Sequence, residues 1–302
     1  MNLSTATDCF ANNPEKIALL TDSCADLSAD LRAGTPIFVV PMKIRCRDGE
    51  FRDGVDIFST DIYARQKAGE LPQTSLPDGE SIDQTLDAIS AAGYQKVIAV
   101  HLSSGLSGTY NMIRLAAEER RDLEIAVFDS LSGSLGIGAT LLQLWEDIQA
   151  GVGFRTLVER RVPSLIANTI PYFSVDTLEY LVKGGRIGKI TALAGTMLNI
   201  KPIVGFSPEG QLTSVAKVRG RKQVQEKFLE LLRRELARGS CYNLAVANGG
   251  APEDMAVLAE KMKAAFPNYE HFWYGELDAT LSVYIGDGVQ GACIQFLDAP
   301  VR

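Results

Sequence analysis

The stretch VIAVHLSSGLSGTYNM, residues 97–112, decides the fold that we expect for this chain. Residues 97–102 are rich in β-branched side chains and predict a short buried strand. Small and hydroxyl-bearing residues then break this pattern, and from Thr109 the apolar residues recur at the spacing of one helix face. The local order is therefore strand, hydroxyl-rich turn, helix.

The turn between this strand and this helix suits a negatively charged group. Its backbone N–H groups and the hydroxyls of Ser103, Ser104 and Ser107 precede a helix N-terminus, where the helix dipole is positive. We therefore interpret the turn as a binding site for a small anion, and a carboxylate is the simplest candidate.

Strands and helices alternate through the first half of the chain. Short apolar runs at residues 17–20, 37–40 and 125–129 predict three more strands, with helical patterns and short links between them. This alternation predicts an α/β domain with a parallel, Rossmann-like sheet that helices cover on both faces. Ligands of such sheets bind beyond the carboxyl ends of the strands. Three polar pairs fall at these ends: Asp22-Ser23, Ser103-Ser104 and Asp129-Ser130.

The second half of the chain mixes strands and helices in a different order. Residues 200–218 predict a hairpin, because two apolar runs flank a Ser-Pro-Glu-Gly turn. The apolar run at 281–285 predicts a strand near the C-terminus. We therefore expect two domains, an N-terminal α/β domain over residues 1–165 and a C-terminal α+β domain over residues 166–302.

Composition excludes several classes of function. The net charge of −7 and the pI near 5.1 argue against nucleic acid as a partner, because phosphate binding needs a basic face. The basic stretch at 217–222 is followed by glutamates and is interpreted as a solvated surface, with a regulatory protein contact as an alternative. The five cysteines are far apart, which predicts neither a metal site nor a disulfide framework. No apolar run approaches the roughly 20 residues of a membrane span, and the first twenty residues contain no signal-peptide pattern. We expect a cytoplasmic protein without integral membrane association.

A serine-dependent enzyme acting on an acyl or small carboxylate substrate is the main alternative to a binding protein. Ser104 lies on a strand-to-helix turn, as a nucleophile does, but the G-x-S-x-G elbow is absent. The two histidines are His101, which lies inside a predicted strand, and His271, which would have to reach across from the other domain. No nucleotide-binding glycine motif is present either. The residues therefore favour binding over catalysis.

An ordered set of motifs resembles those of the DegV family. The set consists of TDS at 21–23, TS-x-P at 74–77, SSGLSGTY at 103–110, DS at 129–130, L-x-K-GGRI at 181–187, NIKPI at 199–203 and K-x-RGRK at 217–222. The resemblance implies a bacterial fatty-acid-binding protein of two domains, with a long-chain fatty acid in a tunnel between them. It also implies that the protein is a carrier without catalytic activity or cofactor. In better-understood members the carrier presents the fatty-acid carboxylate to a separate fatty-acid kinase, which makes the acyl phosphate.

The resemblance also implies which residues hold the ligand. Thr74 and Ser104 correspond to hydrogen-bonding partners of the carboxylate. The groups expected to supplement them are Ser75, Ser103 and the backbone at Ser107 and Gly108. Arg186 resembles the family's arginine beside the carboxylate, although an interdomain ion pair is the simpler interpretation of the residue alone.

The chain departs from the family pattern near its C-terminus. Family members carry a G-T-H-x-G-P-G-like segment whose histidine joins the carboxylate network, whereas residues 285–292 here are IGDGVQGA. Asp287 falls about where the histidine is expected, so we expect Asp287 to complete the site. An ionised aspartate beside a buried carboxylate would repel it unless one group kept a proton or a cation intervened.

Overall fold

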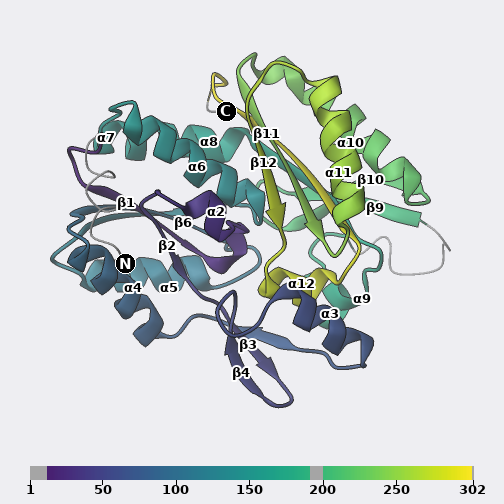
Figure 1. Cartoon of the computed structure of the whole chain (residues 1–302), viewed down its shortest axis with the longest axis horizontal. Coiled ribbons are helices and arrows are strands. Elements are labelled where there is room, and N and C mark those ends of the chain that lie inside the picture. Colours follow the sequence, from purple (N-terminus) through teal and green to yellow (C-terminus); the bar gives the residue numbers. More distant parts are fainter. Residues whose placement is uncertain (1–11, 191–199, 301–302) are drawn as a thin grey trace.

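The computed structural model describes residues 12–190 and 200–300, and no helix within these ranges has the length and apolar character that crossing a membrane requires. The described strands form three sheets (Figure 1). The expectation about a signal peptide rests partly on residues 1–11, which lie outside the described residues, as does Asn199 of the NIKPI motif.

The first sheet is parallel throughout, with the strand order β2-β1-β6-β7. Its strands are β1 (Ile17–Asp22), β2 (Ile37–Val40), β6 (Lys96–His101) and β7 (Glu124–Asp129). Leu20 and Ala99 lie on the face covered by α4 (Gly79–Ala91) and α5 (Thr109–Glu119). Their neighbours in sequence point to the opposite face, which α6 (Leu135–Gln149) covers. The predicted parallel sheet with helices on both faces is confirmed.

Helix α6 lies between the two large sheets and contacts strands of both. Most of its side chains are buried, as expected for a helix that is apolar around its whole circumference. A buried polar contact of this helix also joins the two halves, because Nδ2 of Asn243 donates to Oε1 of Gln143 at 2.8 Å. The core therefore runs continuously from one sheet to the other.

The second large sheet has six strands in the order β10-β9-β8-β13-β11-β12. The strands are β8 (Thr169–Ser174), β9 (Ile200–Phe206), β10 (Leu212–Arg219), β11 (Tyr242–Gly249), β12 (Tyr269–Glu276) and β13 (Val289–Phe296). The β9–β10 hairpin is confirmed, and β11 and β12 are parallel. Helices α10 (Lys222–Glu235) and α11 (Pro252–Ala265) cover one face of this sheet (Figure 1). The other face is turned toward α6 and the first half of the chain.

Short elements connect these layers. The helical ones are η1 (Ser23–Ala25), α2 (Ala29–Arg32), α7 (Phe154–Thr156), the π-helical turn η2 (Leu157–Arg161), α8 (Val162–Asn168), α9 (Glu179–Lys183) and η4 (Leu236–Arg238). The change from the first sheet to the second takes place across α8, so the proposed domain division at residue 165 lies inside this helix.

A small antiparallel sheet lies beside the first one, with the order β4-β3-β5. Its strands are β3 (Lys43–Cys46), β4 (Gly49–Arg52) and β5 (Gln73–Ser75). Thr74 pairs with Ile44 in this sheet and therefore lies in an ordered strand. Helix α3 (Ser59–Lys67) follows β4.

The prediction of a strand at 281–285 is wrong, because this segment belongs to the helix α12 (Ala279–Ile285). The β-branched and aromatic residues here favour a strand locally, but three capping bonds favour a helix. Asp278 accepts the N–H of Leu281 at 2.7 Å, and Asp53 accepts the N–H groups of Ala279 and Thr280 at 3.0 and 3.1 Å. Helix α12 packs against α3, from the other end of the sequence (Figure 1).

Candidate functional site

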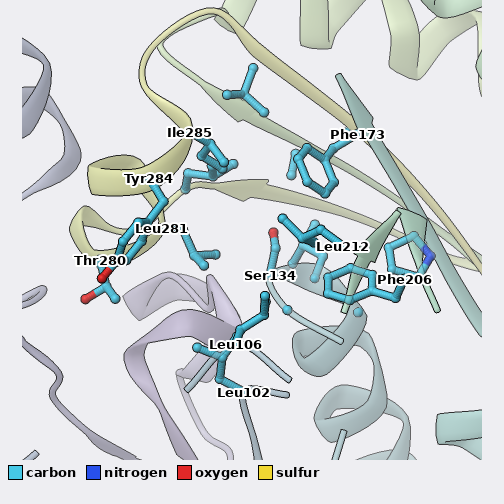
Figure 2. A pocket seen from close by; sticks show the side chains of 18 of the residues that line it. Leu102, Leu106, Ser134, Phe173, Phe206, Leu212, Thr280, Leu281, Tyr284 and Ile285 are labelled. Atoms are coloured by element: carbon cyan, nitrogen blue, oxygen red, sulfur yellow. The ribbon is translucent and has the colours of Figure 1, made fainter. Parts of the chain in front are cut away.

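A cavity lies between the C-terminal edge of the first sheet and the inner face of the second. Its empty space, counted together with the open solvent at its mouth, is about 950 Å³. Aliphatic and aromatic side chains make up most of its wall (Figure 2). Those that surround its centre include Leu102, Leu106, Phe173, Phe206, Leu212 and Leu281. Such a lining suits an apolar ligand.

Small residues on the second sheet help to make room for this cavity. Ala245 and Ala247 of β11 and Gly291 and Ala292 of β13 all line it. Because none of these side chains is larger than a methyl group, this part of the sheet does not fill the space in front of it.

Polar groups gather where the cavity opens. A second, more polar chamber adjoins it there, and the two chambers share Thr74, Arg186 and Tyr284 as lining residues. Ser107 also lines the inner cavity, and its hydroxyl lies 2.8 Å from that of Thr109. The site therefore has one apolar body and one polar end, which matches a ligand of the same kind.

The Gly184-Gly185-Arg186 sequence explains how the arginine reaches this mouth. Gly185 follows α9 with a φ of +71°, and the N–H of Arg186 donates back to the carbonyl of Leu181 at 3.0 Å. At Gly184 a β-carbon would lie 2.4 Å from Cδ1 of Tyr284. The first glycine therefore leaves room for the tyrosine ring, and the second turns the chain so that Arg186 lies beside it.

The charge of Arg186 has no carboxylate partner within the described residues. Its Nη1 donates to the carbonyl of Gly184 at 2.8 Å, its Nε lies 3.4 Å from the carbonyl of Leu106, and its guanidinium lies 4.9 Å from the centre of the Tyr284 ring. The neighbouring Lys183, in contrast, pairs with Glu179. The interdomain ion pair considered as the simpler interpretation is not present among these residues, and the guanidinium charge faces the cavity mouth.

Comparison with known proteins identifies the family. A family model described as an uncharacterised protein of the DegV family matches residues 16–296. The chain belongs to the DegV family. A DegV domain-containing protein of Clostridium acetobutylicum is 37% identical over 280 residues, which cover 93% of this chain and 99% of the relative.

Two solved DegV structures share the architecture. A DegV-family protein of Thermus thermophilus, described as binding fatty acid, superimposes with a TM-score of 0.87 at 30% identity, over 93% of this chain and 100% of that one. DegV of Bacillus subtilis, described as a fatty acid binding protein, gives a TM-score of 0.83 at 28% identity, over 93% and 99% of the two chains. The α/β fold expected from the sequence and the DegV resemblance are confirmed.

The DegV serine motif divides into a structural part and a cavity part. Ser103 is buried, and its hydroxyl donates to the carbonyl of Gly210 at 2.8 Å. A β-carbon on Gly105 would lie 2.7 Å from the same carbonyl oxygen, so the first half of the turn packs closely against the β9–β10 hairpin. Ser107, in the second half of the motif, lines the cavity. Ser103 is therefore occupied by a contact between the two halves of the protein.

Three other expected ligands lie outside the cavity wall. Ser104 is exposed, and its N–H donates to Oδ1 of Asp129 at 3.1 Å. Ser75 is exposed, and its hydroxyl lies 3.5 Å from Glu50, while Gly108 is exposed at the start of α5. Of the expected carboxylate ligands, the structure thus brings together Thr74, Ser107 and Arg186.

The position of Asp287 contradicts the expectation that it completes the site. Asp287 lies in the turn between Gly286 and Gly288, its carboxylate is 2.7 Å from Nζ of Lys67, and its side chain is 45% exposed. It does not line the cavity. The ion pair with Lys67 accounts for its charge.

Tyr284 is the residue that the sequence interpretation missed. If the H-x-G-P-G segment implied by the resemblance is placed on the two glycines, it reads Tyr284-Ile285-Gly286-Asp287-Gly288, and this register puts the tyrosine at the histidine position. Its hydroxyl lies 2.5 Å from that of Thr74. The signal was present in the sequence, but the expected strand at 281–285 gave no reason to prefer this register.

Neither histidine forms a pair with a serine in the described residues. His101 is buried in β6, and its Nδ1 lies 3.1 Å from Oδ2 of Asp22. His271 stacks on Trp273 with ring centres 5.5 Å apart. The arrangement that would activate Ser104 as a nucleophile is therefore not formed. Within the described residues, no group of histidine, cysteine and carboxylate side chains could hold a metal ion.

Buried carboxylates hold α12 in its place at the cavity wall. Asp26 accepts the N–H of Asp278 at 2.8 Å, and no lysine or arginine forms an ion pair with Asp26, Asp53 or Asp278 within the described part of the chain. Burial raises the pKa of Asp26 to about 7, and burial together with the charges of Asp53 and Asp26 raises the pKa of Asp278 well above its ordinary value. The buried site therefore favours the protonated, neutral forms of Asp26 and Asp278.

Proposed function

We propose that this protein binds a long-chain fatty acid between its two halves and presents the carboxylate to a separate fatty-acid kinase. The observation that carries the proposal is the apolar cavity lined by Thr74, Ser107 and an Arg186 that pairs with no carboxylate among the described residues. The DegV structures from Thermus thermophilus and Bacillus subtilis are described as binding fatty acid, which supports the same class of ligand. The protein acts in the cytoplasm as a carrier, and the kinase supplies the chemistry.

The acyl chain provides most of the binding free energy. Each methylene group moved from water into the cavity contributes about 0.8 kcal/mol, so a long chain outweighs any single polar contact. Hydrogen bonds to the ionised carboxylate contribute about 1.5–3 kcal/mol each. The polar end therefore fixes the orientation of the ligand, with the carboxylate at the mouth where a second protein can reach it.

In the proposed head-group site, the serine that binds the carboxylate is Ser107 and not Ser104. Within the SSGLSGT motif, Ser107 is the serine that lines the cavity, whereas Ser104 faces solvent. Thr74 supplies a second hydroxyl from β5, and Arg186 supplies the positive charge. The carboxylate would then lie between groups from both halves of the chain.

Mass spectrometry of lipid extracted from the purified protein tests the ligand. We expect a bound long-chain fatty acid, and we expect the delipidated protein to take up the same acid stoichiometrically. A protein that carries no lipid and takes none up contradicts the proposal. Adding a fatty-acid kinase and ATP to the loaded protein tests the second step, because acyl phosphate should form only when both proteins are present.

A further inference from the structure

We propose that Tyr284 selects the head group by separating the acyl cavity from the outer chamber. The inference rests on the proposed fatty-acid binding and adds a specificity rule to it. Ligands with a compact carboxylate end would be accepted, and monoacyl lipids with a glycerol head would be excluded.

The ring of Tyr284 lies at the junction of the two chambers. It lines both of them, together with Thr74 and Arg186. The lining of the outer chamber also includes the polar side chains of Gln73, Tyr180 and Lys183 beside the apolar Leu71, Pro72 and Val283. A head group larger than a carboxylate would have to extend from the inner cavity into this outer space, and the tyrosine ring occupies that path.

Contacts hold the ring on three sides. The guanidinium of Arg186 lies 4.9 Å from the ring centre, and the hydroxyl is 2.5 Å from that of Thr74. On the remaining side, Gly184 approaches so closely that an added methyl group would overlap the ring. Tyr284 is therefore a fixed partition and not a freely rotating surface side chain.

The backbone that carries the ring is also anchored. The hydroxyl of Ser282 lies 2.8 Å from that of Tyr63, and Nε2 of Gln66 donates to the carbonyls of Ser282 and Val283 at 3.1 Å each. These contacts join α12 to α3, so the partition cannot move aside without breaking buried hydrogen bonds.

The hydroxyl of Tyr284 gives the partition a second effect. A phenol donates a hydrogen bond, and an ionised carboxylate is a stronger acceptor than an alcohol. With Thr74 and Arg186 beside it, the phenol favours an acid over the corresponding alcohol. The same side chain therefore selects the ligand head group both by its size and by its ability to accept a hydrogen bond.

Three ligands with the same 16-carbon chain test the proposal: the fatty acid, the primary alcohol and the 1-monoacylglycerol. We expect Tyr284→Ala to bind the monoacylglycerol at least about tenfold more tightly than the unchanged protein does. We expect Tyr284→Phe, which keeps the ring, to lose about tenfold in affinity for the acid and little for the alcohol. Tyr180→Phe alters a phenol that lines only the outer chamber, so it should leave all three affinities unchanged.

Gly184→Ala provides a test that leaves the phenol in place. Gly184 has an ordinary negative φ, so alanine fits the backbone, but its methyl group displaces the ring. We expect this variant to discriminate less between acid and alcohol, as Tyr284→Phe does. If the unchanged protein binds no fatty acid, the proposed function fails. If it binds the acid but Tyr284→Ala gains no monoacylglycerol binding, or Tyr284→Phe and Gly184→Ala keep full discrimination, the partition is refuted.

Discussion

The backbone N–H of Asp278 donates to the carboxylate of Asp26 at 2.8 Å, and this bond joins the helix at the cavity mouth to the first half of the chain. Asp53 accepts the next two N–H groups of the same helix. Helix α12, which lines the site, is thus held by hydrogen bonds to the carboxylates of Asp26 and Asp53, which lie near the other end of the sequence. Because no lysine or arginine in the described ranges pairs with them, we expect the protonation of these acids to affect how firmly this helix is held.

The stability of the protein should fall as pH rises through the window in which Asp26 titrates. Its native pKa of about 7 lies above the unfolded value of about 3.9, so between these values the native state binds more protons than the unfolded chain. The free energy of unfolding therefore decreases from pH 5 to pH 7.5. Asp278→Asn keeps a good helix cap but removes one acid of the pair, so its decrease should be smaller. Urea denaturation at both pH values measures the difference.

Asp78→Asn is the matched control for this pH effect. Asp78 caps α4 at the surface, and hydrogen bonds from Lys43 and Ser81 lower its pKa to about 2. The stabilising effect of the Asp78 carboxylate is lost only as pH falls below the ordinary pKa of an aspartate. The unfolding free energy of this variant should therefore change with pH between 5 and 7.5 as it does in the unchanged protein. Equal slopes in all three proteins would show that the buried pair does not carry the effect.

Arg186→Ala should weaken fatty-acid binding by about tenfold, since a charge-assisted hydrogen bond to the carboxylate is lost. Displacement of a fluorescent fatty acid measures the affinity. Lys183→Ala is the control, because that lysine lies on the same surface but pairs with Glu179. An equal loss in both variants would indicate general attraction by positive charge instead of a specific site.

Ser107→Ala should weaken fatty-acid retention by about fivefold or more, whereas Ser104→Ala should change it little. The reason is that Ser107 lines the cavity and Ser104 is exposed. Dissociation rates of a bound fluorescent fatty acid measure retention, and thermal unfolding checks that both variants are folded. The opposite ranking would restore the role that the sequence alone assigns to Ser104.

Ala247→Leu should shorten the fatty acid that the protein prefers. Ala247 lines the apolar cavity, and the larger side chain occupies space that the acyl chain otherwise fills. Competition among saturated acids of increasing length measures the preference, and acids that are too short to reach the added side chain serve as the internal control. An unchanged length profile would place the acyl chain elsewhere.

Local patterns were enough to predict the parallel sheet. The strand at 97–102, the turn after it and the helix from Thr109 follow from neighbours in sequence. The resemblance of the Gly-Gly-Arg motif pointed to Arg186, which lines the cavity, and its role toward a ligand stays a prediction.

The parts that could not be predicted depend on distant residues. Helix α12 forms because Asp53 and Asp278 cap it, and Asp53 is more than two hundred residues away in the chain. Ser103 and Ser107 carry the same hydroxyl in the same turn, and only the contact with Gly210 distinguishes the structural one. Because the sequence predicted a strand instead of this helix, Asp287 and not Tyr284 was expected to complete the site.

The continuous core around α6 has a consequence for how the chain folds. Helix α6 is buried against both sheets, so separating the two halves would expose apolar surface that is covered in the intact chain. The two halves should therefore unfold in one cooperative transition, and separately expressed fragments ending or starting near residue 165 should not be stably folded. The ligand cavity would then exist only in the fully folded chain, and partly folded forms would not bind a lipid.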